Sequence, residues 1–253
     1  MVVPCFNESE SLPLFLSEVD RVAKTMMDEW PSLSFEIVLV DDGSSDGTLE
    51  VMREAVSGNW SFRVRWLSFS RNFGKEAALC AGLSAARGDW VATMDADMQD
   101  PPSLLPEMYR IVMTCECDNV ATCRLDRKGE PSVRLWLARK FYALINRISD
   151  VDIVDGARDF RLMCRRMVDA IVSMREYNRF SKGIYGWVGF RTKWISYENM
   201  ERVAGFTKWS FWGLIAYALD GIMAFSTAPL VVASLFEYLT CWGPGLLRLG
   251  AIM

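Results

Sequence analysis

Short apolar runs alternate with helical patterns through the first hundred residues, and this alternation constrains the fold more than any other feature of the sequence. The runs read "MVVP", "FEIVLVDD", "RVRWLSFS" and "WVATMD", and the segments between them include an amphipathic stretch that ends near Glu29 and the Ala-rich "KEAALCAGLSAA". Apolar runs of this length, rich in β-branched residues, predict buried strands. Strands that alternate with helices at this spacing predict a parallel, doubly wound sheet.

Two of the predicted helices begin beside candidate capping residues. Ser9 or Ser11 can cap the helix after the first strand, and Asp46 or Thr48 can cap the next one. The side-chain oxygens of these residue types accept hydrogen bonds from the N–H groups that a helix leaves unpaired in its first turn. We therefore expect both helices to begin at these positions.

Polar side chains follow each of the four predicted strands. The clusters are Asn7 and Glu8, Asp41 and Asp42, Arg71 and Asn72, and Asp95 and Asp97. In a doubly wound sheet, ligands bind beyond the carboxyl ends of the strands. All four clusters are therefore predicted to meet at one edge of the sheet.

The fourth cluster, in "TMDADMQDPP", has the composition of a cation site. Asp95 and Asp97 are two residues apart at the end of a strand, and Gln99 adds a neutral oxygen. Oxygen-only ligands select Mg²⁺ or Mn²⁺, and a small number of carboxylates suits a metal that also holds substrate phosphates. An isolated D-x-D is more often a polar turn. Its place at the last of four converging strand ends favours the cation site.

The earlier clusters fit a nucleotide. Asp42 can accept hydrogen bonds from a base N–H, and Phe6 can cover the base, although ordinary turn chemistry explains "DDGSSDG" equally well. Arg71 and Lys75 flank a glycine at a helix start, which predicts a phosphate cradle. Neither G-x-G-x-x-G nor the P-loop pattern is matched, which excludes dinucleotide oxidoreductases and P-loop NTPases at the motif level.

Composition excludes several other classes of function. The chain has no histidine, so it lacks Ser-His-Asp and Cys-His nucleophilic machinery and histidine-ligated metals. Its seven scattered cysteines, with no visible signal peptide, indicate reduced cytosolic thiols. Residues 1–100 carry 8 Lys and Arg against 17 Asp and Glu, whereas residues 101–253 carry 20 against 15. The basic second part suits phosphates or an acidic membrane surface, and it has no dense basic run of the kind that binds nucleic acid.

The C-terminal part contains an apolar stretch, residues 211–236, whose one charged residue is Asp220. Its uncharged portion, residues 221–236, is 16 residues long. A bilayer crossing usually needs about 20 apolar residues. The stretch therefore predicts a membrane-surface helix or one short span, with a buried core helix as the alternative.

Taken together, "VPCFNE", "VDDGSSDGT", "RNFGKEAAL" and "DADMQDPP" resemble glycosyltransferase family 2, inverting enzymes of the GT-A fold that use nucleotide-diphosphate sugars. The segments "DGARDFRLM", "NRFSKGIYGWVGF" and "ERVAGFTKWSFWGL" resemble more narrowly the polyprenyl-phosphate glycosyltransferases, such as dolichyl-phosphate mannosyltransferase and the undecaprenyl-phosphate glucosyl- and aminoarabinosyltransferases. This resemblance covers residues 1 to about 230. It implies an α/β GT-A fold with a mostly parallel central sheet, followed by C-terminal amphipathic, membrane-associated helices.

The resemblance also implies roles for individual residues. The nucleotide-sugar-binding residues would be Pro4, Phe6, Glu8, Val40, Asp42, Ala96, Arg202 and Lys208. The ligands of Mg²⁺ or Mn²⁺ would be Asp95, Asp97 and Gln99. The catalytic residues on the acceptor side would be Asp155, Asp159, Arg124 and Arg139, with either aspartate as the candidate base. Phe206 departs from the pattern, because the family loop carries an acidic residue there.

We therefore expect a metal-dependent inverting hexosyltransferase that moves a sugar from a UDP- or GDP-sugar to a polyprenyl phosphate at the cytoplasmic face of the cell membrane. Residues 1–208 would form the catalytic domain, with a nucleotide-binding half (1–100) and an acceptor half (101–208). Residues 209–253 would form a membrane-associated helical segment. Family members usually begin several residues earlier and many end in two transmembrane helices, so the resemblance implies a clipped or frame-altered version of such a chain.

The expected partners are the nucleotide sugar, the polyprenyl phosphate and the membrane, and not nucleic acid; the sequence leaves homo-oligomerisation open. Two alternatives also remain. One is a soluble family 2 transferase that acts on a glycan or protein, and the other is a catalytically idle, membrane-anchored module. The apolar segment and "GFTKWSF" favour the polyprenyl-phosphate enzyme over the first, and transfer assays separate it from the second.

Overall fold

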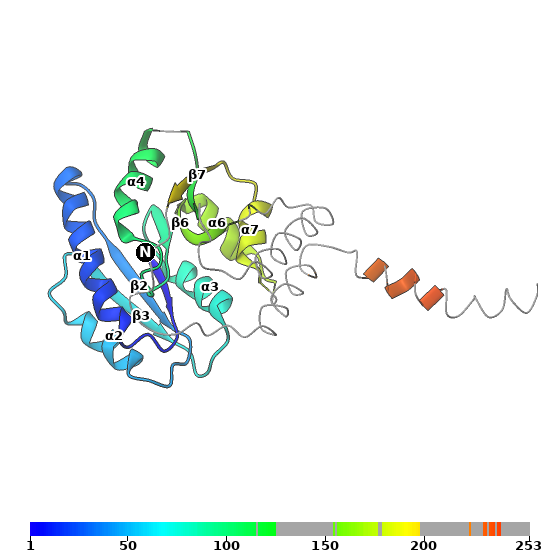
Figure 1. The fold of residues 1–253 in the computed structure, drawn as a ribbon, viewed down its shortest axis with the longest axis horizontal. Helices are drawn as coiled ribbons and strands as arrows, with labels where there is room; N and C mark the ends of the chain where they lie inside the picture. The colour runs from blue at the N-terminus through cyan, green and yellow to red at the C-terminus, as the bar shows by residue number, and fades with distance from the viewer. Residues whose placement is uncertain are drawn as a thin grey trace, which may run out of the picture.

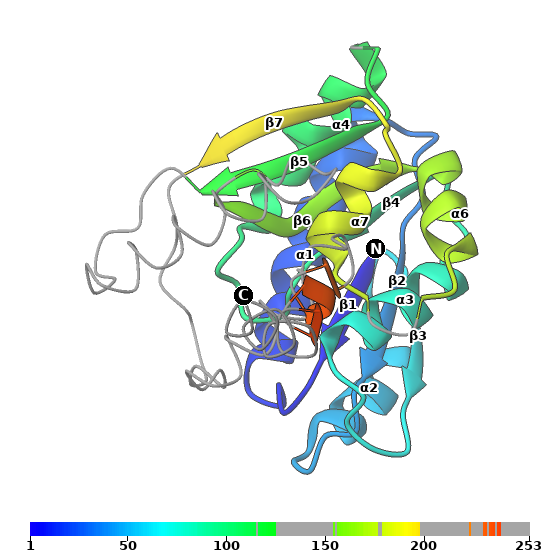
Figure 2. The ribbon, with the colours of Figure 1, turned by 90° about the vertical axis from the view of Figure 1, so that its right-hand side faces the viewer.

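The computed structural model describes residues 1–114, 116–124, 154, 156–176 and 179–197, together with 223, 230–231, 233–235 and 237–238. Within these ranges a seven-stranded sheet is flanked by helices (Figures 1 and 2). Its strands are β1 (Val2–Cys5), β2 (Glu36–Asp41), β3 (Arg63–Ser68), β4 (Trp90–Thr93), β5 (Asn119–Arg124), β6 (Ala157–Cys164) and β7 (Thr192–Tyr197). The helices are α1 (Ser11–Glu29), α2 (Thr48–Val56), α3 (Lys75–Ala85), α4 (Leu105–Thr114), α6 (Arg165–Ser173) and α7 (Ser181–Trp187), with a 3₁₀ helix, η1, at Pro102–Leu104.

The sheet is mixed but mostly parallel, as the sequence predicts. Its strand order is β3-β2-β1-β4-β6-β5-β7. β1 pairs in parallel with β2 and β4, β2 pairs in parallel with β3, and β5 pairs in parallel with β7. β6 is the exception, because it is antiparallel to both β4 and β5. Thr93 of β4 lies opposite Arg161, so the start of β6 adjoins the carboxyl end of β4.

The elements predicted for the first hundred residues are confirmed, but the capping predictions need correction. The N-cap of α1 is Glu10, and no side chain caps this helix. The Ser11 hydroxyl donates to the Glu8 carbonyl, and the backbone N–H of Ser9 donates to Asp46. Gly47 is the N-cap of α2, and Asp46, just before it, accepts the N–H of Thr48 at 3.0 Å.

Helices cover both faces of the sheet, and Figures 1 and 2 show the resulting three layers. The larger core lies under α1, α2 and α4 and includes Phe15, Leu39, Met52, Met108 and Phe160. The second core lies under α3, α6 and α7 and includes Val2, Leu79, Met163, Met167 and Ile184. Burying both faces explains why the strands read as continuous apolar runs instead of alternating patterns.

Helix α3 packs unusually close to the centre of the sheet. A Cβ atom added at Gly82 would lie 2.3 Å from Val2 Cγ1 and 3.1 Å from Val40 Cγ2. Only glycine fits at such a distance. This contact brings the first turn of α3 to the edge where β1 and β2 end.

The end of the chain is described at only a few positions, all of them helical. Leu230, Val231 and Leu235 there are 62%, 53% and 56% exposed. Among the residues that the structure describes, none of the helices combines the length and the apolar character that a bilayer crossing requires. Most of the predicted membrane segment, residues 209–253, lies outside the described residues.

Candidate active site

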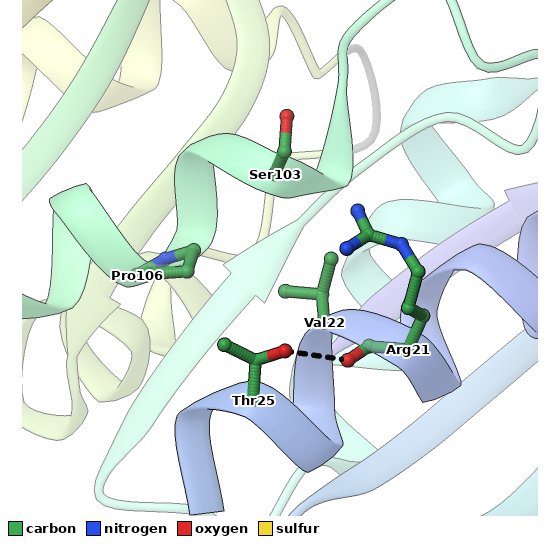
Figure 3. A pocket seen from close by; sticks show the side chains of 5 residues that line it. All are labelled: Arg21, Val22, Thr25, Ser103 and Pro106. Atoms are coloured by element: carbon green, nitrogen blue, oxygen red, sulfur yellow. Dashed lines mark hydrogen bonds between the residues drawn. The ribbon is translucent and has the colours of Figure 1, made fainter. Parts of the chain in front are cut away.

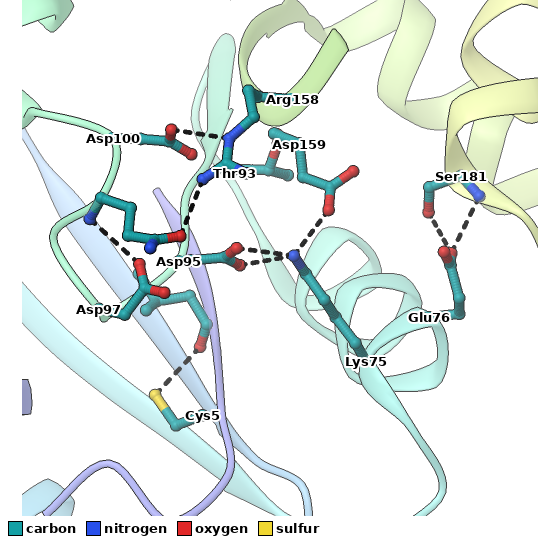
Figure 4. A network of polar contacts seen from close by, with 12 residues as sticks. Cys5, Lys75, Glu76, Thr93, Asp95, Asp97, Asp100, Arg158, Asp159 and Ser181 are labelled. Atoms are coloured by element: carbon teal, nitrogen blue, oxygen red, sulfur yellow. Dashed lines mark hydrogen bonds and ion pairs between the residues drawn. The ribbon is translucent and has the colours of Figure 1, made fainter. Parts of the chain in front are cut away.

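The carboxyl ends of β1, β2 and β4 converge, as predicted, and the start of β6 joins them. Figure 4 shows the centre of this region, where side chains from the β4 loop, from β6 and from the first turn of α3 point toward one another. Three aspartates meet there: Asp95 and Asp97 follow β4, and Asp159 comes from β6. The sequence places the first two together, whereas only the antiparallel pairing of β6 adds the third.

Lys75 lies at the centre of this cluster. Its ammonium donates to Asp159 Oδ2 at 2.6 Å and to Asp95, with distances of 2.7 Å to Oδ1 and 2.8 Å to Oδ2 (Figure 4). The other oxygen of Asp159, Oδ1, is buried without a hydrogen-bond partner among the described residues. Lys75 therefore bridges two carboxylates, one in the loop after β4 and one on β6.

The two carboxylates respond differently to this shared cation. Burial raises the pKa of Asp95, and the charges of Asp159 and Asp97 raise it further, so that the pKa is above its usual range even though Lys75 lowers it. Burial would also raise the pKa of Asp159, but the Lys75 ammonium and the charge of Lys182 lower it well below its usual range. Asp159 therefore stays ionised at neutral pH.

A second ion pair, between Arg158 and Asp100, holds the loop that carries the candidate metal ligands. Arg158 Nε donates to Asp100 Oδ1 at 3.0 Å, and its NH2 group donates to Gln99 Oε1 at 3.3 Å. The Tyr197 hydroxyl donates to the same buried Asp100. Asp97 Oδ1 accepts the N–H of Gln99 at 3.1 Å. The loop after β4 is thus held by side chains from β6 and β7.

These residues fit a divalent cation that is completed by substrate oxygens. In the described part of the chain, no three acidic or thiol side chains form a closed metal site. Asp95 and Asp97 offer two carboxylates, and Gln99 offers an amide oxygen. Mg²⁺ is commonly bound by one or two carboxylates plus substrate phosphates.

Asp42, the predicted base-binding residue, binds the backbone of the loop before α3. Its carboxylate accepts the N–H of Phe73 at 2.7 Å and the N–H of Gly74 at 3.0 Å. Burial raises the pKa of Asp42 above its usual range, although these hydrogen bonds lower it. Asp42 therefore clamps the loop before α3 onto the end of β2.

The other predicted nucleotide residues lie along the ends of β1, β2 and β4. Val40 and Ala96 are buried, and Pro4, Phe6 and Glu8 are partly buried. Backbone-to-side-chain hydrogen bonds join the loops after β1 and β2: the N–H of Asn7 donates to Ser44 Oγ, the N–H of Glu8 donates to Thr48 Oγ1, and the N–H of Ser45 donates to Asn7 Oδ1. The two loops form one wall of the candidate site.

Several predicted residues cannot be placed. Asp155, Arg139, Arg202 and Lys208 lie outside the described residues. Arg124 ends β5, and its side chain is likewise outside the described part. The two residues of the predicted phosphate cradle have these contacts: Lys75 bridges two aspartates, and the Arg71 guanidinium lies 4.1 Å from the centre of the Phe73 ring.

Sequence reasoning missed Arg158, Arg161 and Tyr197. Arg161 is 3% exposed, its Nε has no hydrogen-bond partner within the described ranges, and its guanidinium lies 3.6 Å from the centre of the Tyr185 ring. The segment "DGARDFRLM" could have indicated where its charged side chains point, because residues two apart on a strand share a face of the sheet. Asp159 and Arg161 therefore point to the α3 and α7 side, whereas Arg158 points to the opposite side with Phe160.

A small pocket lies on another part of the molecule. Arg21, Val22 and Thr25 of α1 line it together with Ser103 and Pro106, and its volume is about 200 Å³ (Figure 3). The Thr25 hydroxyl donates to the Arg21 carbonyl beside it. No predicted site residue lines this pocket, so it is separate from the cluster at the strand ends.

Comparison with known proteins shows which family the chain belongs to. The family model described as "Glycosyl transferase family 2" matches residues 1–172. The chain belongs to glycosyltransferase family 2. This family 2 glycosyltransferase is 42% identical over 231 residues to the prophage bactoprenol glucosyl transferase homolog of Escherichia coli K12, covering 91% of the chain and 72% of that relative. It is also 42% identical to the bactoprenol glucosyl transferase of Shigella phage SfV, covering 92% of the chain and 73% of that relative.

Solved structures support a GT-A-like α/β fold for this glycosyltransferase. It resembles a mannosyltransferase from Pyrobaculum calidifontis, determined with GDP-Man and Mn²⁺, at a TM-score of 0.55 and 18% identity over 80% of the chain and 56% of that structure's chain. It also resembles glucosyl-3-phosphoglycerate synthase from Mycobacterium tuberculosis, determined with Mn²⁺, UDP-glucose and phosphoglyceric acid, at a TM-score of 0.53 and 18% identity over 87% of the chain and 76% of that one. At these identities the likeness concerns the fold.

Proposed function

We propose that this glycosyltransferase moves a hexosyl group from a UDP- or GDP-sugar to a polyprenyl phosphate at the cytoplasmic face of the cell membrane, with inversion at the anomeric carbon. The observation that carries the proposal is the similarity to the two bactoprenol glucosyl transferases over 91% and 92% of the chain. That similarity extends beyond the nucleotide-binding half into the part that would meet the acceptor.

The donor would lie along the ends of β1, β2 and β4. Phe6, Glu8 and Asp42 would contact the nucleotide, and Pro4, Val40 and Ala96 would shape the floor beneath it. Structures of the same fold in complex with GDP-Man and with UDP-glucose support a donor of this class. In the proposed closed state, Arg202 and Lys208 would approach the diphosphate.

The departing diphosphate develops negative charge during transfer. A divalent metal between Asp95, Asp97 and Gln99 would supply electrostatic stabilisation of that charge. Arg158 and Tyr197 would keep the loop that carries these ligands in position, because both bind Asp100. Prior placement is what makes such stabilisation effective, because little reorganisation is then needed during the reaction.

The acceptor phosphate requires no strong base from the protein. A polyprenyl phosphate is already anionic at neutral pH, which agrees with a chain that contains no histidine. Asp159 is engaged by Lys75 at 2.6 Å, so we assign it to orienting groups in the site and not to removing a proton. Asp155, Arg124 and Arg139 remain acceptor-side candidates from the family resemblance.

The site would lie at the membrane surface because the polyprenyl chain stays in the bilayer while the nucleotide sugar is soluble. The exposed apolar residues Leu230, Val231 and Leu235 support a surface that contacts lipid. The excess of Lys and Arg after residue 100 would attract anionic headgroups, at about 1 kcal/mol for each basic residue close to the surface.

The test is a transfer assay with radiolabelled UDP- and GDP-sugars, undecaprenyl phosphate, and Mn²⁺ or Mg²⁺. Label that becomes extractable into organic solvent, and that is lost with EDTA, would support the proposal. Label found only in a water-soluble glycan or protein would favour the soluble transferase. Neither transfer nor donor hydrolysis with any donor would indicate an idle module.

A further inference from the structure

The Lys75 ammonium contacts two carboxylates, whereas an ordinary structural salt bridge joins one cation to one carboxylate. Its ammonium lies within 2.8 Å of both oxygens of Asp95 and 2.6 Å from Asp159 Oδ2 (Figure 4). Asp95 belongs to the loop that carries the proposed metal ligands, and Asp159 belongs to β6. The lysine thus connects the donor side of the site to the acceptor side.

The backbone holds this lysine firmly in position. Lys75 is the first residue of α3, and Gly74 before it has φ +94°, a conformation that other residues rarely adopt. Asp42 accepts the N–H groups of Phe73 and Gly74 and so ties this loop to β2. A Cβ atom on Gly43 would lie only 2.4 Å from the Arg71 carbonyl carbon, so the two loops are in close contact. The ammonium therefore reaches the carboxylates from a rigid base.

The two carboxylates differ in the cations around them. The charges of Lys75, Lys182 and Arg161 all act on Asp159. Asp95 is paired with Lys75 among the described residues. Arg158, also on β6, is paired with Asp100. A divalent cation that binds Asp95 would therefore compete with Lys75 for that carboxylate.

A divalent cation and the Lys75 ammonium cannot use the same Asp95 oxygens at once. Two cations held by the same carboxylate oxygens repel each other, and burial strengthens this repulsion because it lowers the effective dielectric constant. We propose that Lys75 is a positioning residue: it holds Asp95 in place in the metal-free protein, yields Asp95 when the metal binds, and keeps Asp159 oriented toward the acceptor. This inference rests on the metal-dependent transfer proposed above.

The unpartnered oxygen of Asp159 agrees with this assignment. Oδ2 is bound by Lys75, while Oδ1 is buried and accepts no hydrogen bond from any described residue. A buried carboxylate oxygen that lacks a partner is costly and is normally satisfied by something that binds there. By holding Oδ2, Lys75 fixes the orientation of the Asp159 carboxylate.

The decisive experiment measures Mn²⁺ binding by electron paramagnetic resonance, with Mn²⁺ alone as the probe, beside steady-state transfer kinetics. We expect Lys75→Met to bind Mn²⁺ more tightly than the wild type, by roughly tenfold, because a competing cation is removed. Its kcat should nevertheless fall about tenfold or more, because Asp95 and Asp159 lose their common anchor. Lys75→Arg, which keeps the charge, should bind Mn²⁺ close to the wild-type affinity.

The matched control is Lys24→Met. Lys24 pairs with Asp20 at 2.5 Å on the surface of α1, away from the site, so both Mn²⁺ affinity and kcat should stay at wild-type values. A folded Lys75→Met that binds Mn²⁺ equally or less tightly, or that keeps full kcat, would overturn the inference. If the methionine variant does not fold, Lys75→Gln provides the same comparison. Wild-type protein that binds no Mn²⁺, with or without a nucleoside diphosphate, would instead refute the metal dependence in the proposed function.

Discussion

The carboxylate of Asp42 binds the backbone N–H of Gly74 at 3.0 Å and thereby joins the end of β2 to the loop that begins α3. This contact ties Asp42, a proposed nucleotide-binding residue, to the residue before Lys75, which binds Asp95 and Asp159. The proposed nucleotide side and the proposed metal side thus share one loop. A change at Asp42 should therefore affect stability as well as donor binding.

We expect Asp42→Ala to lower the free energy of unfolding by about 1–3 kcal/mol, because the N–H groups of Phe73 and Gly74 lose their acceptor. Urea denaturation followed by circular dichroism measures this loss. The exposed Asp28→Ala serves as the control and should be nearly neutral. If both variants unfold at the same urea concentration, Asp42 does not hold the loop in solution.

Asp95→Asn should reduce transfer by at least about a hundredfold, because it weakens the stabilisation of the departing diphosphate. The fold should survive, since Lys75 keeps Asp159 as its partner at 2.6 Å. Transfer assays and thermal melts on the same preparation separate the two effects. Asp169→Asn, on the surface of α6, is the control for loss of a carboxylate. Near-normal turnover in Asp95→Asn would contradict the metal assignment.

Asp20 should contribute stability that depends on pH. Burial would raise the pKa of Asp20, but Lys24 and the N–H and hydroxyl of Ser61 bind its carboxylate and lower the pKa below its usual range. A carboxyl group with a depressed folded-state pKa stabilises the fold above its unfolded pKa, about 3.9, and this stability is lost as the pH falls through the folded-state pKa. Asp20→Asn should therefore melt at a lower temperature than the wild type at pH 7.

The difference between these two proteins should vanish in acid, where Asp20 is protonated. Thermal melts of wild type and Asp20→Asn at a series of pH values from about pH 7 into acid test this, because the difference should begin to shrink near the ordinary aspartate pKa of about 3.9 and vanish below the lowered folded-state pKa of Asp20. Asp28→Asn controls for a general effect of removing an exposed carboxylate. A melting-temperature difference that is constant across the whole range would show that Asp20 acts through packing and not through its charge.

Gly82→Ala should destabilise the protein by about 1–3 kcal/mol through overpacking, because the added methyl group would lie 2.3 Å from Val2 Cγ1. Gly47→Ala offers a matched comparison, since the nearest atom to its methyl group is Ser9 Cβ at 3.8 Å. Chemical denaturation of the two variants gives the difference. Gly82→Ala that is as stable as Gly47→Ala would mean that α3 is not pressed against β1 as the structure has it.

Membrane association should depend on both charge and apolar burial. Salt screens the attraction between basic residues and anionic headgroups, but it does not screen burial of an apolar segment. We therefore expect the chain to stay in the membrane fraction after a high-salt wash and to be released by detergent. Deletion of residues 211–253 should make the bound fraction salt-sensitive. Complete release of the intact chain by salt alone would exclude an inserted apolar segment.

Local sequence patterns were sufficient to predict β1 to β4, α1 and α3, together with the convergence of four polar clusters. Strand and helix periodicity depend on neighbouring residues, and parallel strands joined by helices must place their carboxyl ends at one edge. The positions of Asp42, Asp95 and Asp97 at that edge follow from this rule alone. The family motifs are likewise contiguous in the chain, so local residue order is enough to carry the family 2 resemblance.

The helix caps show where local reasoning failed. Ser9 and Ser11 have the right chemistry for an N-cap, yet Ser9 N–H bonds to Asp46, 37 residues away, and the Ser11 hydroxyl bonds to Glu8. Contacts between the loops after β1 and β2 decide where α1 begins. A propensity that is worth about 1 kcal/mol is readily overridden by such tertiary contacts.

Only the tertiary structure determines which charged side chains lie next to one another. The antiparallel insertion of β6 between β4 and β5 brings Asp159 next to Asp95, although they are 64 positions apart in the numbering. The same insertion directs Arg158 to Asp100 and lets one lysine on α3 serve two carboxylates. Strand order and direction depend on which long-range pairing buries the most apolar surface and satisfies the backbone, and no local pattern encodes that choice. The sequence by itself determined which chemical groups stand at the strand ends, and packing of the sheet determined their partners.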